Sequence, residues 1–451
     1  MNCSRPRARR YQADGYLISY AFLPNQRFED GLVRVVLVEG YIKDYQLQGE
    51  LGAVQGYLEK LVAKMKGERP LTRATFERYT ALMSRIPGVR VRAELPPPGT
   101  TDGAARLNVA AVREAWNSSL SFSDGNNSSG QALVTLTSNS HTSFGEQISL
   151  GALYPPGEDH ERYLRFDYGQ YLSSEGTRLN LFASSYRSDP SDNLRLTNGL
   201  ELERRRSSDR LSLGVSHPFV ATATSWLSGT VRLYGVDDST HYRGVGFPLS
   251  IKDETDIRVL ALEADWRQSN AQRFRIVSGG LYRGLNTLGA KTENDLFDLE
   301  FTRMNLYAMQ SDKFGERWQG VLSGALYWSE DNLPDAEQAI FGGQNFGRGY
   351  PNDQASGDKG WGVGYELGYS FTLENKWLSL LQPYVAVDAA RAWFNEQPVR
   401  HSELSSAALG IRFGDARYYN ISLEAAKPMA DKALDSNNRN PRLTVSFSYQ
   451  L

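Results

Sequence analysis

The chain of 451 residues is long enough for two or three domains, and its 50 basic and 52 acidic residues leave a formal charge of −2 at pH 7. This balance excludes the strong positive field that attracts nucleic acid, so we expect no nucleic-acid partner. Cys3 is the only cysteine, which excludes an internal disulfide and a cysteine metal cluster, and we expect no cofactor and no metal.

The mean hydropathy of −0.47 and the lack of any apolar run near about 18 residues argue against membrane helices. A transmembrane β-barrel would remain compatible with these values, because its apolar surface is hidden in alternation along the strands. The 41 glycines and the 11% of aromatic residues favour an all-β protein.

The first segment, residues 1–40, starts with the basic stretch "MNCSRPRARRYQADGY". This stretch lacks the apolar core of a signal peptide, which favours a start inside a longer gene. Further along, "LVRVVLVEGYI" (32–42) is rich in apolar residues and predicts a strand.

The next segment, residues 41–110, mixes helix and strand signals. In "LTRATFERYTALMSRIPGV" (71–89), apolar side chains recur at helical spacing, and Pro87-Gly88 stops the helix. "VRVRAELPPPG" and "ARLNVAAV" follow as two strands around a proline-rich turn. The segment therefore predicts a small α/β unit. The residues on the shared helix face are Phe76, Tyr79, Met83 and Ile86.

From about residue 111 the sequence alternates between apolar and polar residues. In "PRLTVSFSYQL" (441–451), Leu, Val, Phe and Tyr take one face and Thr and Ser the other, and "GVGYELGYSFTL" (362–373) and "LFDLEFTR" (296–303) show the same division. There are seventeen such runs of about eight to twelve residues, the length that a tilted strand needs to cross a bilayer. The run "LRLTNGLELERRR" (194–206) ends in three arginines and fits a loop or a strand extension. Without it sixteen strands remain, and single-chain bacterial barrels have even strand numbers.

A soluble β-sandwich also alternates, and it is the commoner source of such patterns. However, the runs continue for some 340 residues without a helix pattern, which is too long for one sandwich. Their polar faces carry Glu, Asp and Arg, as expected for water inside and lipid outside. We predict that residues 111–451 form a 16-stranded antiparallel transmembrane β-barrel behind small α/β units.

The stretch "FGGQNFGRGYPNDQASGDKG" (341–360) is rich in glycine but also carries aromatic residues and one arginine, Arg348. These residues predict a folded loop, 329–360, that inserts into another part of the protein, where Arg348 meets an acid, while a disordered surface loop is the alternative. That it inserts into the barrel lumen is what the family resemblance described below implies. In "PYVAVDAARAW" (383–393), Asp388 lies on the face opposite the valines, so it faces the lumen if the valines face lipid. There a guanidinium could pair with it through two hydrogen bonds. The alternative is that both residues are ordinary solvated charges.

Taken together, these segments resemble the outer-membrane transporters of two-partner secretion, the haemolysin and filamentous-haemagglutinin secretion/activation family. "RPLTRATFERYTALMSRIPGVRVRAEL" (69–95) resembles the second POTRA domain of that family, and residues 15–40 resemble the back half of the first. The resemblance implies a partial first POTRA domain over 1–40, a second over 41–110 and the barrel over 111–451. No counterpart of the family's amino-terminal plug helix is visible in the sequence.

The glycine-rich stretch resembles the family's long loop with a V/I-R-G-Y/F tip. Here the tip is Gly347-Arg348-Gly349-Tyr350, with glycine in place of the β-branched residue, and Gly357, Asp358 and Glu366 also match the family. The resemblance implies that Arg348 pairs with Asp388 of an F-x-D-x-G strand motif. In that motif Ala386 and Ala390 replace the phenylalanine and the second glycine, which leaves open how the aromatic residues of the tip are packed.

The resemblance implies a pore in the bacterial outer membrane that exports a partner exoprotein, with the POTRA side in the periplasm. The exoprotein's amino-terminal secretion domain would bind the POTRA unit and then thread the lumen. A barrel assembly factor of the same superfamily is the alternative, and a passive porin would need no POTRA unit. We expect no catalytic residues: the five histidines have no metal-ligand spacing, although His217 beside Ser216 invites comparison with barrel lipases.

Overall fold

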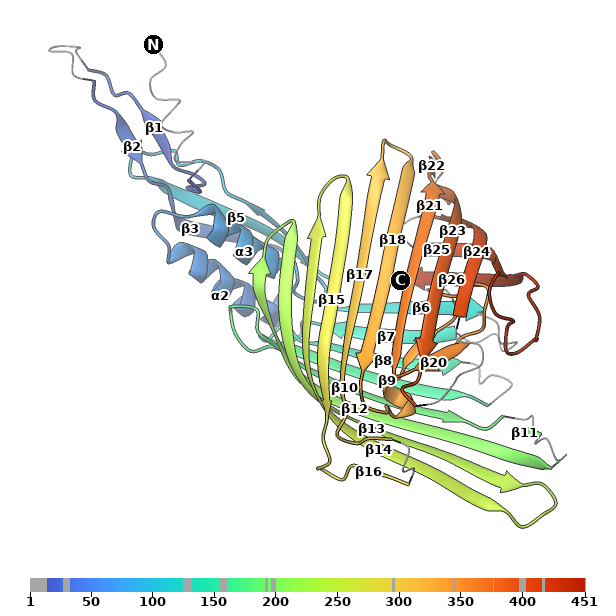
Figure 1. Ribbon diagram of the computed structural model, residues 1–451. Helices are drawn as coiled ribbons and strands as arrows, with labels where there is room; N and C mark the ends of the chain where they lie inside the picture. The colour runs from blue at the N-terminus through green and yellow to red at the C-terminus, as the bar shows by residue number, and fades with distance from the viewer. Residues whose placement is uncertain are drawn as a thin grey trace.

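The computed structural model describes residues 14–26, 33–124, 132–154, 160–190, 194–195, 200–293, 297–343, 346–375, 377–396, 403–415 and 418–450. Within them the chain forms a small α/β unit followed by a closed β-barrel (Figure 1). Among these residues, no helix is long and apolar enough to cross a bilayer.

The amino-terminal part contains a two-stranded ribbon, β1 (Tyr20–Phe22) with β2 (Val36–Val38), and a three-stranded sheet in the order β3-β5-β4. In the sheet, β5 (Ala104–Arg113) is central, parallel to β3 (Tyr41–Gln48) and antiparallel to β4 (Val89–Glu94). The short 3₁₀ helix η1 (Gly52–Val54) and the helices α2 (Gln55–Lys66) and α3 (Arg73–Met83) connect β3 to β4.

Helix α3 begins at Thr72, whose side chain accepts a hydrogen bond from the Thr75 backbone N–H, a typical N-cap. It ends at Met83, earlier than the Pro87-Gly88 stop that the sequence predicts, and the chain continues in single turns to Ile86. Met83 and Ile86 are buried, as the helical spacing predicts. Helix α2 was not predicted, although its apolar residues also enter the core: Leu58, Leu61, Val62 and Met65.

Sixteen antiparallel strands close the barrel, confirming the predicted fold class. Closure is made by the last strand pairing with the first, with Phe447 opposite Phe122, so the barrel has no free edge. The strands are β6 (Trp116–Asp124), β7 (Ala132–Asn139), β8 (Gln147–Tyr154), β9 (Arg162–Tyr171), β10 (Arg178–Ser188), β12 (Glu201–Ala221), β13 (Ser225–Gly244), β14 (Ser250–Ser269), β15 (Arg273–Gly284), β17 (Thr302–Phe314), β18 (Trp318–Ser329), β21 (Lys359–Tyr369), β23 (Leu380–Trp393), β24 (Glu403–Gly414), β25 (Tyr419–Pro428) and β26 (Arg442–Gln450). Three two-residue strands lie alongside them: β11 (Leu194–Arg195), β16 (Lys291–Thr292) and β22 (Phe371–Thr372).

The alternation of side chains divides the outer wall from the lumen. On β23, Val385 and Val387 are exposed on the outside, whereas Ala386 and Asp388 are buried inside the barrel, as the sequence predicts. On β26, Leu443 is 77% exposed and its neighbour Thr444 only 6%. An apolar outer surface around a polar interior is the pattern of a barrel in lipid.

Two of the alternating sequence runs do not correspond to separate barrel strands in the structure. Of residues 194–206, Leu194–Arg195 form the short strand β11, and Glu201–Arg206 are the first six residues of β12, so this part of the run is a strand extension. The run 296–303 is mostly not a strand: residues 297–301 form turns, and β17 begins only at Thr302. The strand predicted for 296–303 is therefore mostly wrong, because residues in turns can also alternate in polarity.

The two ends of the barrel differ. On the side of the α/β unit, described turns between strands are short, and the carboxyl end of β26 lies beside the start of β6. At the opposite end, β12, β13 and β14, with 21, 20 and 20 residues, project beyond their neighbours (Figure 1). The loop between β18 and β21 also starts at this end and turns back into the barrel.

Candidate functional site: a loop held inside the barrel

The loop of residues 330–358, here called the lumen loop, connects β18 to β21. It contains a 3₁₀ turn, η2 (Asp335–Glu337), and a hairpin of β19 (Ala339–Phe341) with β20 (Ala355–Gly357). Its tip packs against the inner wall formed by β23 and β24, where small residues leave room for it. The buried residues of this contact are Phe341, Phe346, Tyr350, Ala355, Ala390, Ala392 and Leu404.

Glycines allow the tip to approach the wall this closely. Gly347 has φ +96°, a backbone conformation that L side chains rarely adopt. A Cβ at Gly349 would lie 2.5 Å from the backbone nitrogen of Pro428 at the end of β25. On the wall, a Cβ at Gly362 would lie 2.7 Å from the Phe346 ring. The aromatic packing therefore uses wall glycines in place of a wall phenylalanine.

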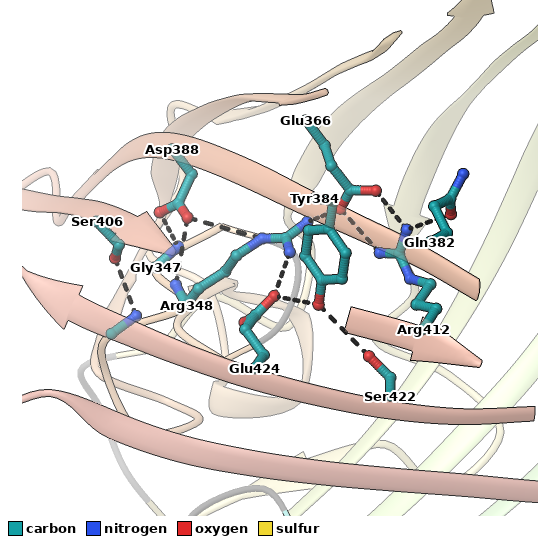
Figure 2. Close-up of polar contacts among 11 residues, drawn as sticks. Gly347, Arg348, Glu366, Gln382, Tyr384, Asp388, Ser406, Arg412, Ser422 and Glu424 are labelled. Carbon is teal, nitrogen blue, oxygen red and sulfur yellow. Dashed lines mark hydrogen bonds and ion pairs between the residues drawn. The ribbon is translucent and has the colours of Figure 1, made fainter. Parts of the chain in front are cut away.

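Asp388 holds the backbone of the tip. Its two carboxylate oxygens accept the backbone N–H groups of Gly347 and Arg348, with N···O distances of 2.6 and 3.4 Å (Figure 2). The backbone N–H of Gly349 donates to the hydroxyl of Ser406 on β24 at 3.0 Å. Three consecutive residues of the tip are thus fixed to the wall through their main chain.

The guanidinium of Arg348 donates its hydrogen bonds to two acids other than the predicted Asp388, with which it keeps a longer ion-pair contact. Nη1 donates to Glu424 on β25 at 2.5 Å and Nη2 to Glu366 on β21 at 3.0 Å, while Nε lies 3.9 Å from the nearest oxygen of Asp388. The expected two-hydrogen-bond pair with Asp388 is therefore wrong in its geometry. Asp388 uses its oxygens for the backbone, so the guanidinium extends past it to the next acids.

Glu366 and Glu424 each have a second donor on the wall. Arg412 on β24 donates to both oxygens of Glu366, and Tyr384 on β23 donates its hydroxyl to Glu424 at 2.8 Å (Figure 2). The Arg412 guanidinium also lies over the Tyr384 ring, 4.0 Å from its centroid. The site therefore contains three buried carboxylates and two arginines, one of which belongs to the loop.

The base of the loop is fixed by Asp358, just before β21. Its carboxylate accepts the backbone N–H groups of Leu333 and Asn395, at 2.8 and 2.9 Å. Gly357 lies so close to β23 that a Cβ there would be 2.4 Å from the carbonyl oxygen of Trp393. The structure thus brings six predicted residues of the loop to the wall that includes β23, β24 and β25: Gly347, Arg348, Gly349, Tyr350, Gly357 and Asp358.

A second anchor holds the loop to another part of the inner wall, formed by β13, β15 and β17, and the sequence analysis did not identify it. Glu337 of η2 accepts hydrogen bonds from Arg303 on β17 at 2.5 Å and from the Tyr234 hydroxyl on β13 at 2.9 Å. The Arg303 guanidinium lies 3.7 Å from the centroid of the Tyr282 ring on β15. The Glu337 side chain is only 3% exposed, so this ion pair is nearly dry.

The α/β unit is docked onto the end of the barrel. Glu175, in the turn between β9 and β10, accepts the Tyr79 hydroxyl at 2.8 Å and lies within ion-pair distance of Lys64 and Arg78. The Tyr57 ring stacks on Tyr171 of β9, with centroids 4.7 Å apart. We name these contacts between the helices and the barrel turn the junction.

Ser216 and His217 do not form a catalytic pair. They are neighbours on β12, so their side chains point to opposite faces of the wall. The Ser216 hydroxyl accepts from Asn180, and the His217 ring bonds with Thr177 at 2.9 Å. Both contacts are ordinary structural ones.

Comparison with known families and proteins agrees with this architecture. The family described as "Haemolysin secretion/activation protein ShlB/FhaC/HecB" matches residues 248–413, and "POTRA domain, ShlB-type" matches residues 8–40. The heme/hemopexin transporter protein HuxB of Haemophilus influenzae strain 86-028NP is 20% identical over 454 residues, 95% of this chain and 77% of HuxB. HuxB of strain Rd is 22% identical over 456 residues, 95% of this chain and 76% of HuxB.

Solved structures share the fold. CdiB from Escherichia coli superimposes with a TM-score of 0.78 at 18% identity, covering 99% of this chain and 83% of CdiB. BamA from Haemophilus ducreyi lacking POTRA domains 1–3 gives 0.55 at 14% identity, covering 97% and 91%. These likenesses show the fold, while the family-model matches and the HuxB relatives confirm the resemblance to two-partner secretion transporters. The boundaries at residues 40 and 110 stay predictions.

Proposed function

We propose that this chain, a relative of the two-partner secretion transporters, exports a partner exoprotein across the bacterial outer membrane through its own barrel. The observation that supports this most is the lumen loop, which contacts two separate parts of the inner wall and is held by side chains that can exchange partners. A passive porin would need neither this loop nor the docked α/β unit.

Export requires the lumen loop to move, and the contacts around Arg348 lower the cost of that movement. When Arg348 leaves, Glu366 keeps both hydrogen bonds from Arg412, and Glu424 keeps the hydroxyl of Tyr384. Breaking a buried ion pair typically costs about 3–5 kcal/mol, because one charge is left without compensation. Here the remaining donors, together with lumen water, reduce that cost, so the contacts that hold Arg348 in the lumen can break and form again.

The α/β unit is the site that we propose for capture of the exoprotein's amino-terminal secretion domain. β4 is an edge strand among the described residues, with β5 on one side only. Next to it lies a cavity of about 600 Å³ with a largely apolar lining that includes Leu17, Phe76 and Leu95. An added peptide strand would gain main-chain hydrogen bonds from the edge and place alternate side chains in this cavity.

We also propose that the α/β unit and the carboxyl end of the barrel lie in the periplasm. The first barrel strand starts and the last one ends on that side, and the cargo arrives from there. The lumen loop and the projecting strands β12–β14 then lie on the cell surface side. No nucleotide is available in the periplasm, so folding of the cargo outside the cell would bias the direction.

The test starts from the neighbouring genes: a large exoprotein encoded beside this gene would support export, its absence would weaken it, and such an exoprotein would be the cargo of an export assay. Cells that express the exoprotein with the intact chain should release it into the medium, and cells without the chain should retain it. Deleting residues 41–110 should abolish release while a heat-modifiable barrel still assembles. Normal release by that folded deletion variant would remove the α/β unit from the mechanism.

A barrel assembly factor is the alternative, because BamA has a related fold. Deleting the gene distinguishes the two functions: an assembly factor's absence lowers the amounts of many outer-membrane proteins. An exporter's absence affects the secreted partner alone.

A further inference from the structure

The outer surface of the barrel changes character along β12 and β13. From their middle toward the α/β unit these strands carry exposed apolar residues, among them Leu211, Leu213 and Leu233. Beyond them the same outward face carries charged residues on the projecting halves of the strands. The change marks the level at which the lipid headgroups of the far leaflet meet the wall.

Basic side chains gather at this level around a cavity of about 550 Å³. The register places them on the outward face: Arg187 lies opposite Arg162 on one side and Ser207 on the other, and Arg205 lies opposite His241. Because residues two apart share a face, these positions continue the outward row of Leu211. Three arginines of the outward face, Arg162, Arg187 and Arg205, line the cavity together with two histidines and two acids, Asp189 and Glu203. Arg206 also contributes to the lining but has the inward position on β12.

Not all of this positive charge is used within the protein. Arg187 binds Asp209 through two hydrogen bonds, at 3.0 and 2.7 Å, and Arg205 binds Asp189 at 3.1 Å. Among the described residues, Arg162 has no carboxylate within ion-pair distance, and its side chain is exposed. An unpaired guanidinium beside two others is a site for an anion.

Directly below this cavity, toward the apolar band, lies a second one of about 420 Å³. Its lining is mainly apolar, with Leu211, Leu213 and Leu233, and also includes the acids Asp209 and Asp237. The Arg258 side chain lies beside Gly235, 3.1 Å from where a Cβ would be. Arg258 closes its upper rim and binds Asp237 at 2.6 Å. We call this mainly apolar cavity the notch. A notch beside a basic cavity suits an acyl chain that is attached to a charged headgroup.

We propose that these two cavities together bind one lipid with a phosphorylated headgroup from the outer leaflet, with phosphate at Arg162, Arg187 and Arg205 and an acyl chain in the notch. Guanidinium groups bind phosphate through paired, charge-assisted hydrogen bonds. The site faces the bilayer and not the lumen, so exported cargo does not reach it. The inference rests on the proposed orientation, which places this end of the barrel at the outer leaflet.

The test is native mass spectrometry of the purified full chain in detergent, titrated with diphosphorylated lipid A, with dephosphorylated lipid A and with inorganic phosphate. The intact chain should retain one diphosphorylated lipid at low lipid concentration. The variant Arg162→Gln with Arg205→Gln should need at least tenfold more lipid for the same occupancy. The matched control is Arg275→Gln, an outward arginine at the other end of the barrel whose guanidinium binds the amide oxygen of Gln310.

Several outcomes would overturn the site. Equal weakening by Arg275→Gln would mean nonspecific charge attraction, and equal retention of dephosphorylated lipid would mean that the phosphate is not recognised. Tight binding of inorganic phosphate alone would reduce the site to an anion site without a lipid. Export by the double variant should stay at the level of the intact chain. A loss of lipid binding with normal export therefore separates this site from the proposed function.

Discussion

Arg348 of the lumen loop and Arg412 of the barrel wall donate to the same carboxylate, that of Glu366. Without Arg348 the site holds three carboxylates, Glu366, Glu424 and Asp388, and Arg412 as the one remaining cation of this set. The loop arginine is therefore needed to balance the charge of the wall, beyond forming any single pair. Five predictions test this arrangement and the topology around it.

The first prediction concerns Arg348 itself. Arg348→Ala should release the loop tip at a cost to the folded loop of about 3 kcal/mol or less, because a lumen is wetter than a protein core. Arg348→Lys should rescue poorly, since the single nitrogen of an ammonium group cannot occupy the separate positions from which Nη1 and Nη2 donate to Glu424 and Glu366. Chymotrypsin cleavage at Phe346 and Tyr350 measures the release, and single-channel conductance measures the opened lumen. If Arg348→Ala resisted chymotrypsin as well as the wild-type protein does, Arg348 would not be needed to hold the loop in the lumen.

The second prediction concerns the charge swap of Arg348→Asp with Asp388→Arg. A simple ion pair between these residues would be restored by the swap. Here we expect the double variant to export no better than either single variant, because Asp388 binds backbone N–H groups that an arginine cannot accept. Asp388→Asn, which keeps one acceptor oxygen, should be milder than Asp388→Ala. Rescue by the swap would show that the side-chain pair dominates.

The third prediction concerns the second anchor. Glu337→Gln should loosen the η2 end of the loop, because Arg303 is then left as a buried charge over Tyr282. Arg303→Gln should have an effect of similar size, and the two changes together should cost less than their sum, because each removes the same interaction. A double-mutant cycle on loop proteolysis measures this coupling. Additive effects would mean that the two side chains act independently.

The fourth prediction concerns pH at the junction. Burial raises the pKa of Glu175, but hydrogen bonds from Lys64 and Tyr79 outweigh it and hold this pKa below its ordinary value of 4.5. The carboxylate therefore stabilises docking above about pH 4.5, and its contribution is lost as the pH falls through the lower, folded-state value.

Tyr79 limits the same contact at high pH. Burial, followed by its hydrogen bond to Glu175, raises the pKa of Tyr79 to about 12, so its contribution is present below pH 10 and is lost as the pH rises through the folded value. Distances between spin labels on α3 and on the barrel turn should stay narrow between these limits and broaden beyond them. Glu175→Gln should remove the acidic transition, and an unchanged transition would assign it to another group.

The fifth prediction is topological. In a variant with Cys3 replaced by serine, a cysteine at Asn332 or Asn438 should react with an impermeant label on intact cells. A cysteine at Glu316, in a turn at the end of the barrel that carries the α/β unit, should react only after the outer membrane is opened. Asn126, in another loop expected at the surface, lies outside the described residues. The reverse labelling pattern would invert the proposed orientation.

Much of this protein could be predicted from local sequence pattern. A period of two fixes which residues of a strand share a face, so the lumen position of Asp388 followed from the valines beside it. Helical spacing in the same way identified the core face of α3. The glycines around Arg348 indicated a tip that approaches other backbone closely, and the structure places that approach at Pro428.

The partners of the loop were decided only by the tertiary structure. Glu424 lies on the polar face of its run, so its position in the alternation alone could have marked it as an acid that faces the lumen. Many other acids of the barrel also have lumen-facing positions. Which of them Arg348 reaches depends on the register between β21, β23, β24 and β25, and on the path of the loop backbone past Asp388. The pairing of Glu337 with Arg303 likewise depends on how far the loop extends across the lumen. Local periodicity does not contain these distances, because they arise from barrel closure, which brings residues far apart in the sequence to within a few ångströms of each other.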